Sequence, residues 1–140
     1  MTLDGSWAAD APATGGILVT GMMSHAMYRL DPFTATFERI VIPVERSNPR
    51  AVKLDQRGDW WVLLGAPGKV ARYTPARREW KTYDIGMYPH GITVGGDGRV
   101  GFNGHFTRHP AQIDVIDVAF GASPARVPSR MARIQMEKRS

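Results

Sequence analysis

Apolar and polar residues alternate over short stretches of the chain, with apolar side chains at every second position. Trp60, Val62 and Leu64 follow this spacing, and so do Val100 and Phe102. A period of two places successive side chains on opposite faces of a β-strand. Dipeptides with glycine or proline separate the runs, and no apolar stripe of helical spacing accompanies them. The pattern therefore predicts short strands joined by tight turns.

The same arrangement returns along the chain at a fixed interval. The run Pro49-Arg50-Ala51-Val52 returns 40 residues later as Pro89-His90-Gly91-Ile92, and a glycine follows each run after six residues. A second pair of segments, 15–19 and 58–62, matches at an interval of 43 residues. A strand pattern with a period of about 40–45 residues is typical of four-stranded propeller blades. We therefore predict an all-β fold of about three four-stranded antiparallel propeller blades, an incomplete β-propeller that oligomerisation could close.

The repeats divide the chain into five segments. We predict an N-terminal extension (1–14), three blades (15–46, 47–86 and 87–120) and a basic tail (121–140). The first blade has only three predicted strands, and a fourth strand of the last blade would have to come from the tail. Because propellers have at least four blades, two interpretations stay open. Two chains complete a ring as a homodimer of three plus three blades, or the chain is a shortened relic of a longer gene.

Composition narrows the classes of function. The chain has 140 residues, of which 43% are hydrophobic and none is cysteine. These values fit one soluble domain and exclude thiol catalysis and cysteine-held metals. No stretch is apolar over the roughly 18 residues that a membrane helix needs, and residues 1–16 lack the pattern of a signal peptide. We therefore expect no membrane partner and, by default, a cytoplasmic location.

The basic charge of the chain is concentrated at one end. The formal net charge is +5, and residues 121–140 carry five basic residues against one acidic residue. The remaining 120 residues are therefore almost neutral. A basic tail can contact phosphate, but a tail with two prolines and few large apolar residues is typical of a solvated extension. Nucleic acid is not the expected partner.

The repeat resembles that of the virginiamycin B lyase (streptogramin lyase) family, which is related in architecture to NHL-repeat propellers. The resemblance covers about residues 15–120 and depends on Pro89-His90-Gly91-Ile92, on Asp97-Gly98 and on strands that end in Arg72-Tyr73-Thr74-Pro75 or its equivalent. It implies a closed propeller of about seven blades. Lyases of the family open a cyclic depsipeptide by elimination at the ester, with histidine and glutamate side chains and Mg²⁺ at the mouth of the channel.

Individual positions agree with that family pattern only in part. His90 matches a family position that borders the channel, and Arg50 is its equivalent one repeat earlier. The family glutamate has no counterpart, because its places are Gly21, Leu64 and Gly104. The candidate catalytic residues are His90 and His105, and the candidate binding residues are Arg50, His90, Asn103, His105 and Arg108.

The segment 103–110 is the most distinctive loop. It replaces a short hairpin turn by a longer stretch of polar and aromatic residues. Loops on a rigid scaffold often carry binding residues. His105 and His109 are four residues apart, but no third ligand lies near them in sequence, so we expect no metal site. A structural insertion is the alternative interpretation of this loop.

These residues favour a binding module over an enzyme. We expect a module that binds a small-molecule, peptide or protein ligand and needs no cofactor. The alternative is a Mg²⁺-dependent carbon–oxygen lyase that opens a cyclic depsipeptide lactone of the streptogramin B type. A sugar-lactone hydrolase is a third option, for which Asn103 is the one candidate ligand. His90 also has a purely structural interpretation, in which its imidazole hydrogen-bonds a neighbouring loop.

Overall fold

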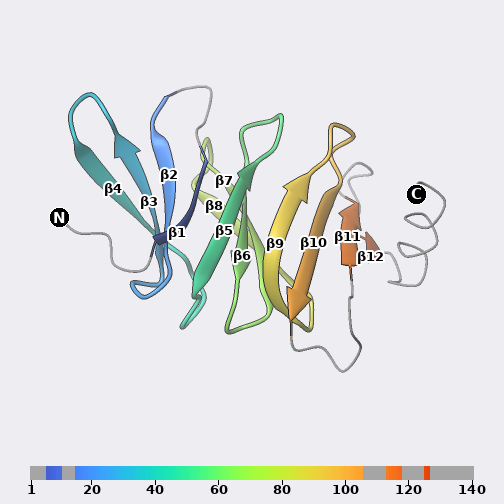
Figure 1. Ribbon diagram of the computed structural model, residues 1–140. Coiled ribbons are helices and arrows are strands. Elements are labelled where there is room, and N and C mark those ends of the chain that lie inside the picture. Colours follow the sequence, from blue (N-terminus) through green and yellow to red (C-terminus); the bar gives the residue numbers. More distant parts are fainter. Residues whose placement is uncertain (1–5, 11–14, 106–112, 118–124, 127–140) are drawn as a thin grey trace.

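The part of the chain that the structure describes forms twelve strands in three sheets (Figure 1). The computed structural model describes residues 6–10, 15–105, 113–117 and 125–126, and no helix occurs among them. Accordingly, the described residues contain no helix that could span a membrane.

Each sheet has four antiparallel strands in sequence order. Sheet 1 contains β1 (Ser6–Asp10), β2 (Ile17–Gly21), β3 (Ala26–Asp31) and β4 (Thr36–Val41). Sheet 2 contains β5 (Pro49–Leu54), β6 (Trp60–Leu64), β7 (Lys69–Thr74) and β8 (Glu79–Asp84). Sheet 3 contains β9 (Tyr88–Val94), β10 (Val100–His105), β11 (Ile113–Asp117) and β12 (Ala125–Arg126). The prediction of three four-stranded antiparallel blades is confirmed.

The first sheet has four strands, whereas the repeat pattern predicted three. Its fourth strand is β1, which pairs with β2 and lies within the segment expected to be an extension. The repeat did not reveal β1 because this strand precedes the first matching glycine and consists largely of small residues, including Ala8 and Ala9. In sheet 3 the fourth strand, β12, does come from the basic tail, where it pairs with β11.

Two hydrophobic cores lie on opposite faces of sheet 2. Trp60, Val62 and Leu64 of β6 join the core that sheet 2 shares with sheet 1. Trp61 and Leu63 alternate with them and join the core shared with sheet 3. Every residue of β6 is buried for this reason, since a strand in a middle blade has a neighbouring sheet on both sides. Trp60 and Trp61 therefore point to opposite faces of sheet 2 and fill the two cores.

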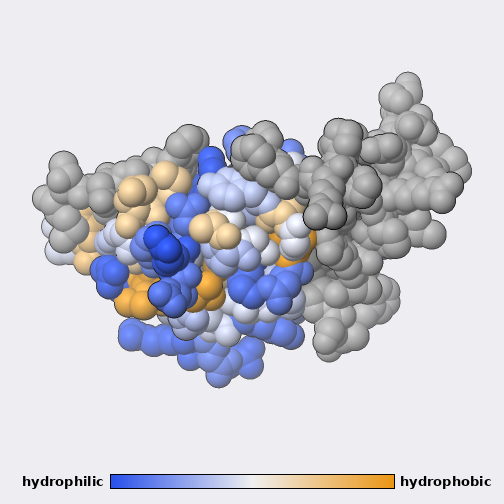
Figure 2. Space-filling model, turned by 90° about the horizontal axis from the view of Figure 1, so that it is seen from below, coloured by the Kyte–Doolittle hydropathy of each residue, from blue (hydrophilic) through white to orange (hydrophobic). Residues whose placement is uncertain are grey.

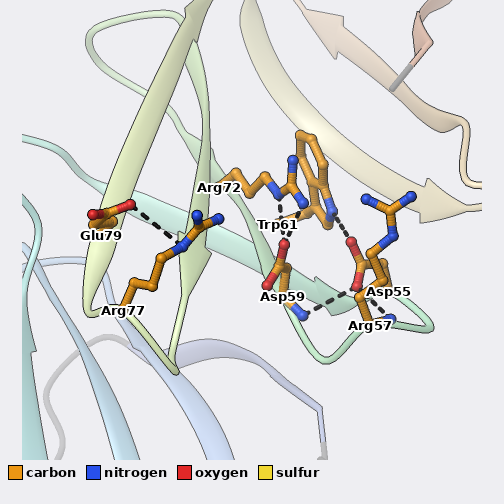
Figure 3. A network of polar contacts seen from close by, with 7 residues as sticks. All are labelled: Asp55, Arg57, Asp59, Trp61, Arg72, Arg77 and Glu79. Carbon is orange, nitrogen blue, oxygen red and sulfur yellow. Dashed lines mark hydrogen bonds and ion pairs between the residues drawn. The ribbon is translucent and has the colours of Figure 1, made fainter. Parts of the chain in front are cut away.

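A polar network closes the end of sheet 2 where β5 turns into β6 (Figure 3). The Asp55 carboxylate accepts hydrogen bonds from the Trp61 indole N–H at 3.0 Å and from two backbone N–H groups of the turn. Arg72 donates to Asp59 through Nε at 2.7 Å and stacks over the Trp61 ring. Burial lowers the pKa of Arg72, but the hydrogen bond and the charge of Asp59 more than offset this, so the pKa lies above its ordinary value.

The turn between β3 and β4 is fixed by a side chain of its first residue. The Asp31 carboxylate accepts backbone hydrogen bonds from Phe33 at 2.8 Å and from Thr34 at 3.2 Å. These N–H groups stabilise the ionised carboxylate, which holds the pKa of Asp31 below its ordinary value. Asp31 therefore sets the bend locally, as aspartate does in many turns.

Candidate functional site

The innermost strands β1, β5 and β9 lie next to one another and begin or end at a common edge of the sheets. We call this edge the connection end; it contains the loops 22–25 and 65–68 and the connections 42–48 and 85–87. It lies at the bottom of Figure 1, and Figure 2 looks onto it. The described surface there is largely hydrophilic, with smaller hydrophobic areas between (Figure 2). The opposite edge, with the hairpin turns 55–59 and 95–99, is the turn end.

Each innermost strand carries a β-bulge at the connection end. In β5, Pro49 pairs with Leu64 and Ala51 with Leu63, which leaves Arg50 as the extra residue. In β9, His90 is the extra residue between the pairs of Pro89 and Gly91.

The ladder of β1 shifts in the same way, and Trp7 follows the pair Ser6–Gly21 as Arg50 follows Pro49–Leu64. A bulge leaves its residue outside the ladder and re-aims the side chain. Arg50 and His90 are thus the extra residues at equivalent places of β5 and β9, and the register shift of β1 falls at residues 7–8.

Arg50 is half-buried and held by an aromatic neighbour from the next blade. Its Nη1 donates to the Tyr88 hydroxyl at 2.5 Å, and its guanidinium carbon lies 5.0 Å from the centre of the Tyr88 ring. His90 lies two residues beyond Tyr88 in the same strand and is exposed. The structure therefore brings the Arg50 guanidinium to the strand that carries His90.

The other predicted site residues are less well placed for a shared site. Asn103 is exposed, and its Oδ1 accepts the Gly91 backbone N–H at 2.7 Å, which ties β10 to β9. His105 is the last residue of β10, so its backbone is at the connection end. Arg108 lies outside the described residues.

Sequence reasoning missed a hydrogen-bonded group that links the three blades. Asn48 donates its backbone N–H to His25 Nδ1 at 3.1 Å, and its Oδ1 accepts the Tyr88 hydroxyl at 3.3 Å. Its carbonyl accepts the Gly65 N–H at 2.9 Å. Because Nδ1 of His25 is an acceptor, the ring hydrogen of the neutral imidazole is on Nε2. Asn48 and Tyr88 each precede a repeat proline, so comparison of that position across repeats could have found them.

The backbone of this group is strained. His25, Arg46 and Asn48 have φ values of 54°, 50° and 48°, in the left-handed region that non-glycine residues rarely adopt. The Ser47 hydroxyl donates to the His25 carbonyl at 3.1 Å and helps to hold the loop. Strained residues persist where surrounding contacts over-determine them, and they cluster at functional sites. The strained residues of the connection end therefore agree with a functional site there.

The three positions of the family glutamate cannot supply a metal site. Leu64 is fully buried in the apolar core between sheets 1 and 2. A Cβ at Gly104 would lie 2.6 Å from Met87 Sδ and 2.7 Å from the Tyr88 carbonyl, and a Cβ at Gly21 would overlap Ser24. Among the residues that the structure describes, no group of three or more acidic or histidine side chains could hold a metal ion. These residues do not fit the Mg²⁺ of the lyases.

The three sheets, with their innermost strands side by side, define part of a β-propeller. Comparison with solved structures gives the same class. Streptogramin B lyase is similar with a TM-score of 0.76 and 15% sequence identity, over 90% of this chain and 41% of that one. Virginiamycin B lyase from Staphylococcus aureus has a TM-score of 0.74 and 16% identity, over 89% and 41% of the two chains.

The likeness extends to proteins of other functions. Kuenenia stuttgartiensis hydrazine synthase is similar with a TM-score of 0.74 and 20% identity, over 90% of this chain and 36% of that chain. No family model and no curated protein sequence matches the chain. The chain spans about two fifths of the length of the lyases. The fold is therefore that of virginiamycin B lyase and of other propeller proteins alike.

Proposed function

We propose that the chain is a propeller-type binding module whose recognition surface is the inner rim of the connection end. The observation that carries this proposal is the pair of equivalent bulges at Arg50 and His90. A bulge re-aims the side chain of its residue and is common next to functional sites. Arg50 is held in place by Tyr88, and a few fixed polar groups of this kind are typical of small-molecule recognition. A small molecule or a peptide is the expected ligand.

The alternative is a Mg²⁺-dependent carbon–oxygen lyase. Elimination at an ester needs a base for the α-proton and positive charge near the developing enolate. His90 offers a base on the exposed rim. The buried Leu64 and the crowded Gly104 stand where the family has carboxylates, and this favours binding without turnover.

Quinupristin separates the two functions, since one of the similar structures is a catalytically inactive virginiamycin B lyase with this compound. We expect the chain to leave quinupristin cyclic in the presence of Mg²⁺ while NMR signals of Arg50, Tyr88 and His90 shift. Elimination gives a linear product of unchanged mass, so chromatographic retention and the new alkene protons must be followed. His90→Ala is the matched variant.

Ring opening that is lost in His90→Ala would establish the lyase and contradict the binding module. Shifts at the turn end, with the rim unaffected, would also contradict the proposed site. Ring opening that persists in His90→Ala would contradict both the module and the role of His90 in the lyase alternative.

A second copy of the chain is the partner that we propose for ring closure. Sheet 2 lies between the other two sheets (Figure 1). Strand pairing places Ile17, Leu30 and Phe37 in one row of sheet 1, on the face opposite to the buried Leu18 and Met27. Apart from Arg39, that face is largely apolar although it points away from sheet 2, as a face that packs against a further blade would be.

We expect light scattering of the chain to give twice the monomer mass of 15.5 kDa. The double variant Leu30→Asp/Phe37→Asp should restore the monomer, because it places two charges in the proposed interface. Phe33→Asp is the control, since Phe33 is 95% exposed on the β3–β4 turn. A wild-type monomer at all concentrations tested would contradict this partner.

A further inference from the structure

Basic residues outnumber acidic ones at the connection end. Its described charged residues are Arg39, Arg46, Arg50, Lys69, Glu45 and Asp84, and two histidines, His25 and His90, accompany them. Lys69 and Asp84 form an ion pair with each other. The other charged residues of this end are three arginines and one glutamate, so the connection end carries excess positive charge. The first 120 residues of the chain are, by contrast, almost neutral. A surface with an excess of one sign of charge concentrates ligands of the opposite sign.

We propose that this rim recognises an organic oxyanion, a carboxylate or a phosphate ester, through Arg50, with His90 as the neighbouring donor. The inference rests on the proposed binding module and specifies its ligand class. A guanidinium presents a planar set of N–H donors that matches the two oxygens of a carboxylate or phosphate.

The contacts of Arg50 fix its guanidinium before any ligand binds. Tyr88 accepts from Nη1 and also stacks against the group, and Asn48 in turn accepts the Tyr88 hydroxyl. Gly65 packs under this arrangement, since a Cβ there would lie 3.0 Å from both Arg50 Cδ and Tyr88 Cζ. A donor that is already oriented loses less conformational freedom on binding. The surface is therefore built for one orientation of an anionic group.

His90 is the proposed second donor because its position in β9 matches that of Arg50 in β5. Arg50 and His90 occupy the same bulge position in adjacent innermost strands. Strands β5 and β9 are neighbours, and Tyr88 of β9 already reaches the Arg50 side chain. Arg50 and His90 therefore lie at equivalent places of two neighbouring blades.

Four compounds of nearly the same shape test this inference: benzoate, phenyl phosphate, neutral benzamide and cationic benzamidine. NMR titration of the full chain should show shifts at Arg50, Tyr88 and His90 with the two anions and none with benzamidine. Arg50→Gln should weaken anion binding at least tenfold, because the charge-assisted hydrogen bonds are lost. Arg57→Gln is the control, since Arg57 is an exposed arginine at the turn end, and it should leave binding unchanged.

The two anions distinguish the two sources of the oxyanion. Tighter binding of benzoate assigns a carboxylate, and tighter binding of phenyl phosphate assigns a phosphate ester. Equal binding of benzamidine or benzamide at the rim would overturn the oxyanion class and leave the binding module intact. Anion binding that Arg50→Gln does not weaken would overturn the role of Arg50, with thermal unfolding of the variant as the check that it folds.

Discussion

Trp61→Ala should remove most of the stability of the chain. The indole is fully buried between sheets 2 and 3, where it stacks with the Tyr83 ring at a centroid distance of 6.0 Å. Its N–H also donates a hydrogen bond to the Asp55 carboxylate. Truncation of a buried tryptophan costs about 3–5 kcal/mol, which is a large part of the 5–15 kcal/mol that holds a typical domain together. Urea unfolding followed by far-ultraviolet circular dichroism measures this loss.

Phe33→Ala is the control for that experiment. Phe33 is 95% exposed, so its truncation should change the free energy of unfolding by less than about 0.5 kcal/mol. A loss of less than about 1 kcal/mol for Trp61→Ala would mean that sheets 2 and 3 do not pack as described, because a filled core cannot lose an indole at so small a cost.

Asp59→Ala should destabilise the chain by about 3 kcal/mol, because it leaves the Arg72 charge without its acceptor in a partly buried place. The side chains of Arg72 and Asp59 are 20% and 7% exposed. Loss of one partner from a fully buried pair costs about 3–5 kcal/mol, and water that reaches Arg72 keeps the value at the lower end of that range. Urea unfolding again gives the free energy.

Glu79→Ala provides the matched control at a separate ion pair, between Arg77 and Glu79 (Figure 3). The Arg77–Glu79 pair is 3.5 Å long, and both side chains are about two thirds exposed. Exposed ion pairs contribute roughly 0–1 kcal/mol. Similar losses for Asp59→Ala and Glu79→Ala would contradict the buried character of the Arg72–Asp59 pair.

Local patterns in the sequence were sufficient for the architecture. The spacing of Trp60, Val62 and Leu64, and the return of the same run after 40 residues, predicted strands and blades without knowledge of their neighbours. The same alternation places Trp61 on the other face, in the core between sheets 2 and 3. Strand β1 was not predicted, because it is a strand through its pairing with β2 rather than through its own composition.

Only those residues of the candidate site that belong to the recurring motif could be predicted from the sequence. Arg50 and His90 stood out because they occupy equivalent positions of a recurring motif. Asn48, Tyr88 and His25 act through hydrogen bonds between residues that are 23 to 40 positions apart. Such contacts depend on how one blade sits on the next. The repeat shows that Asn48 and Tyr88 hold the same position before a proline, but it does not show that their side chains meet.

The bulges of the innermost strands contain positions whose side chains can change while the strand pairing stays the same. Pro49 and Ala51 have register partners in β6, whereas Arg50 between them is the extra residue of the bulge. Exchange of such a residue leaves the register of the strands unchanged, and an added repeat brings one more such position. A protein of this kind can therefore acquire new specificities one side chain at a time, and randomising positions 50 and 90 together would create a library of binders on a constant scaffold.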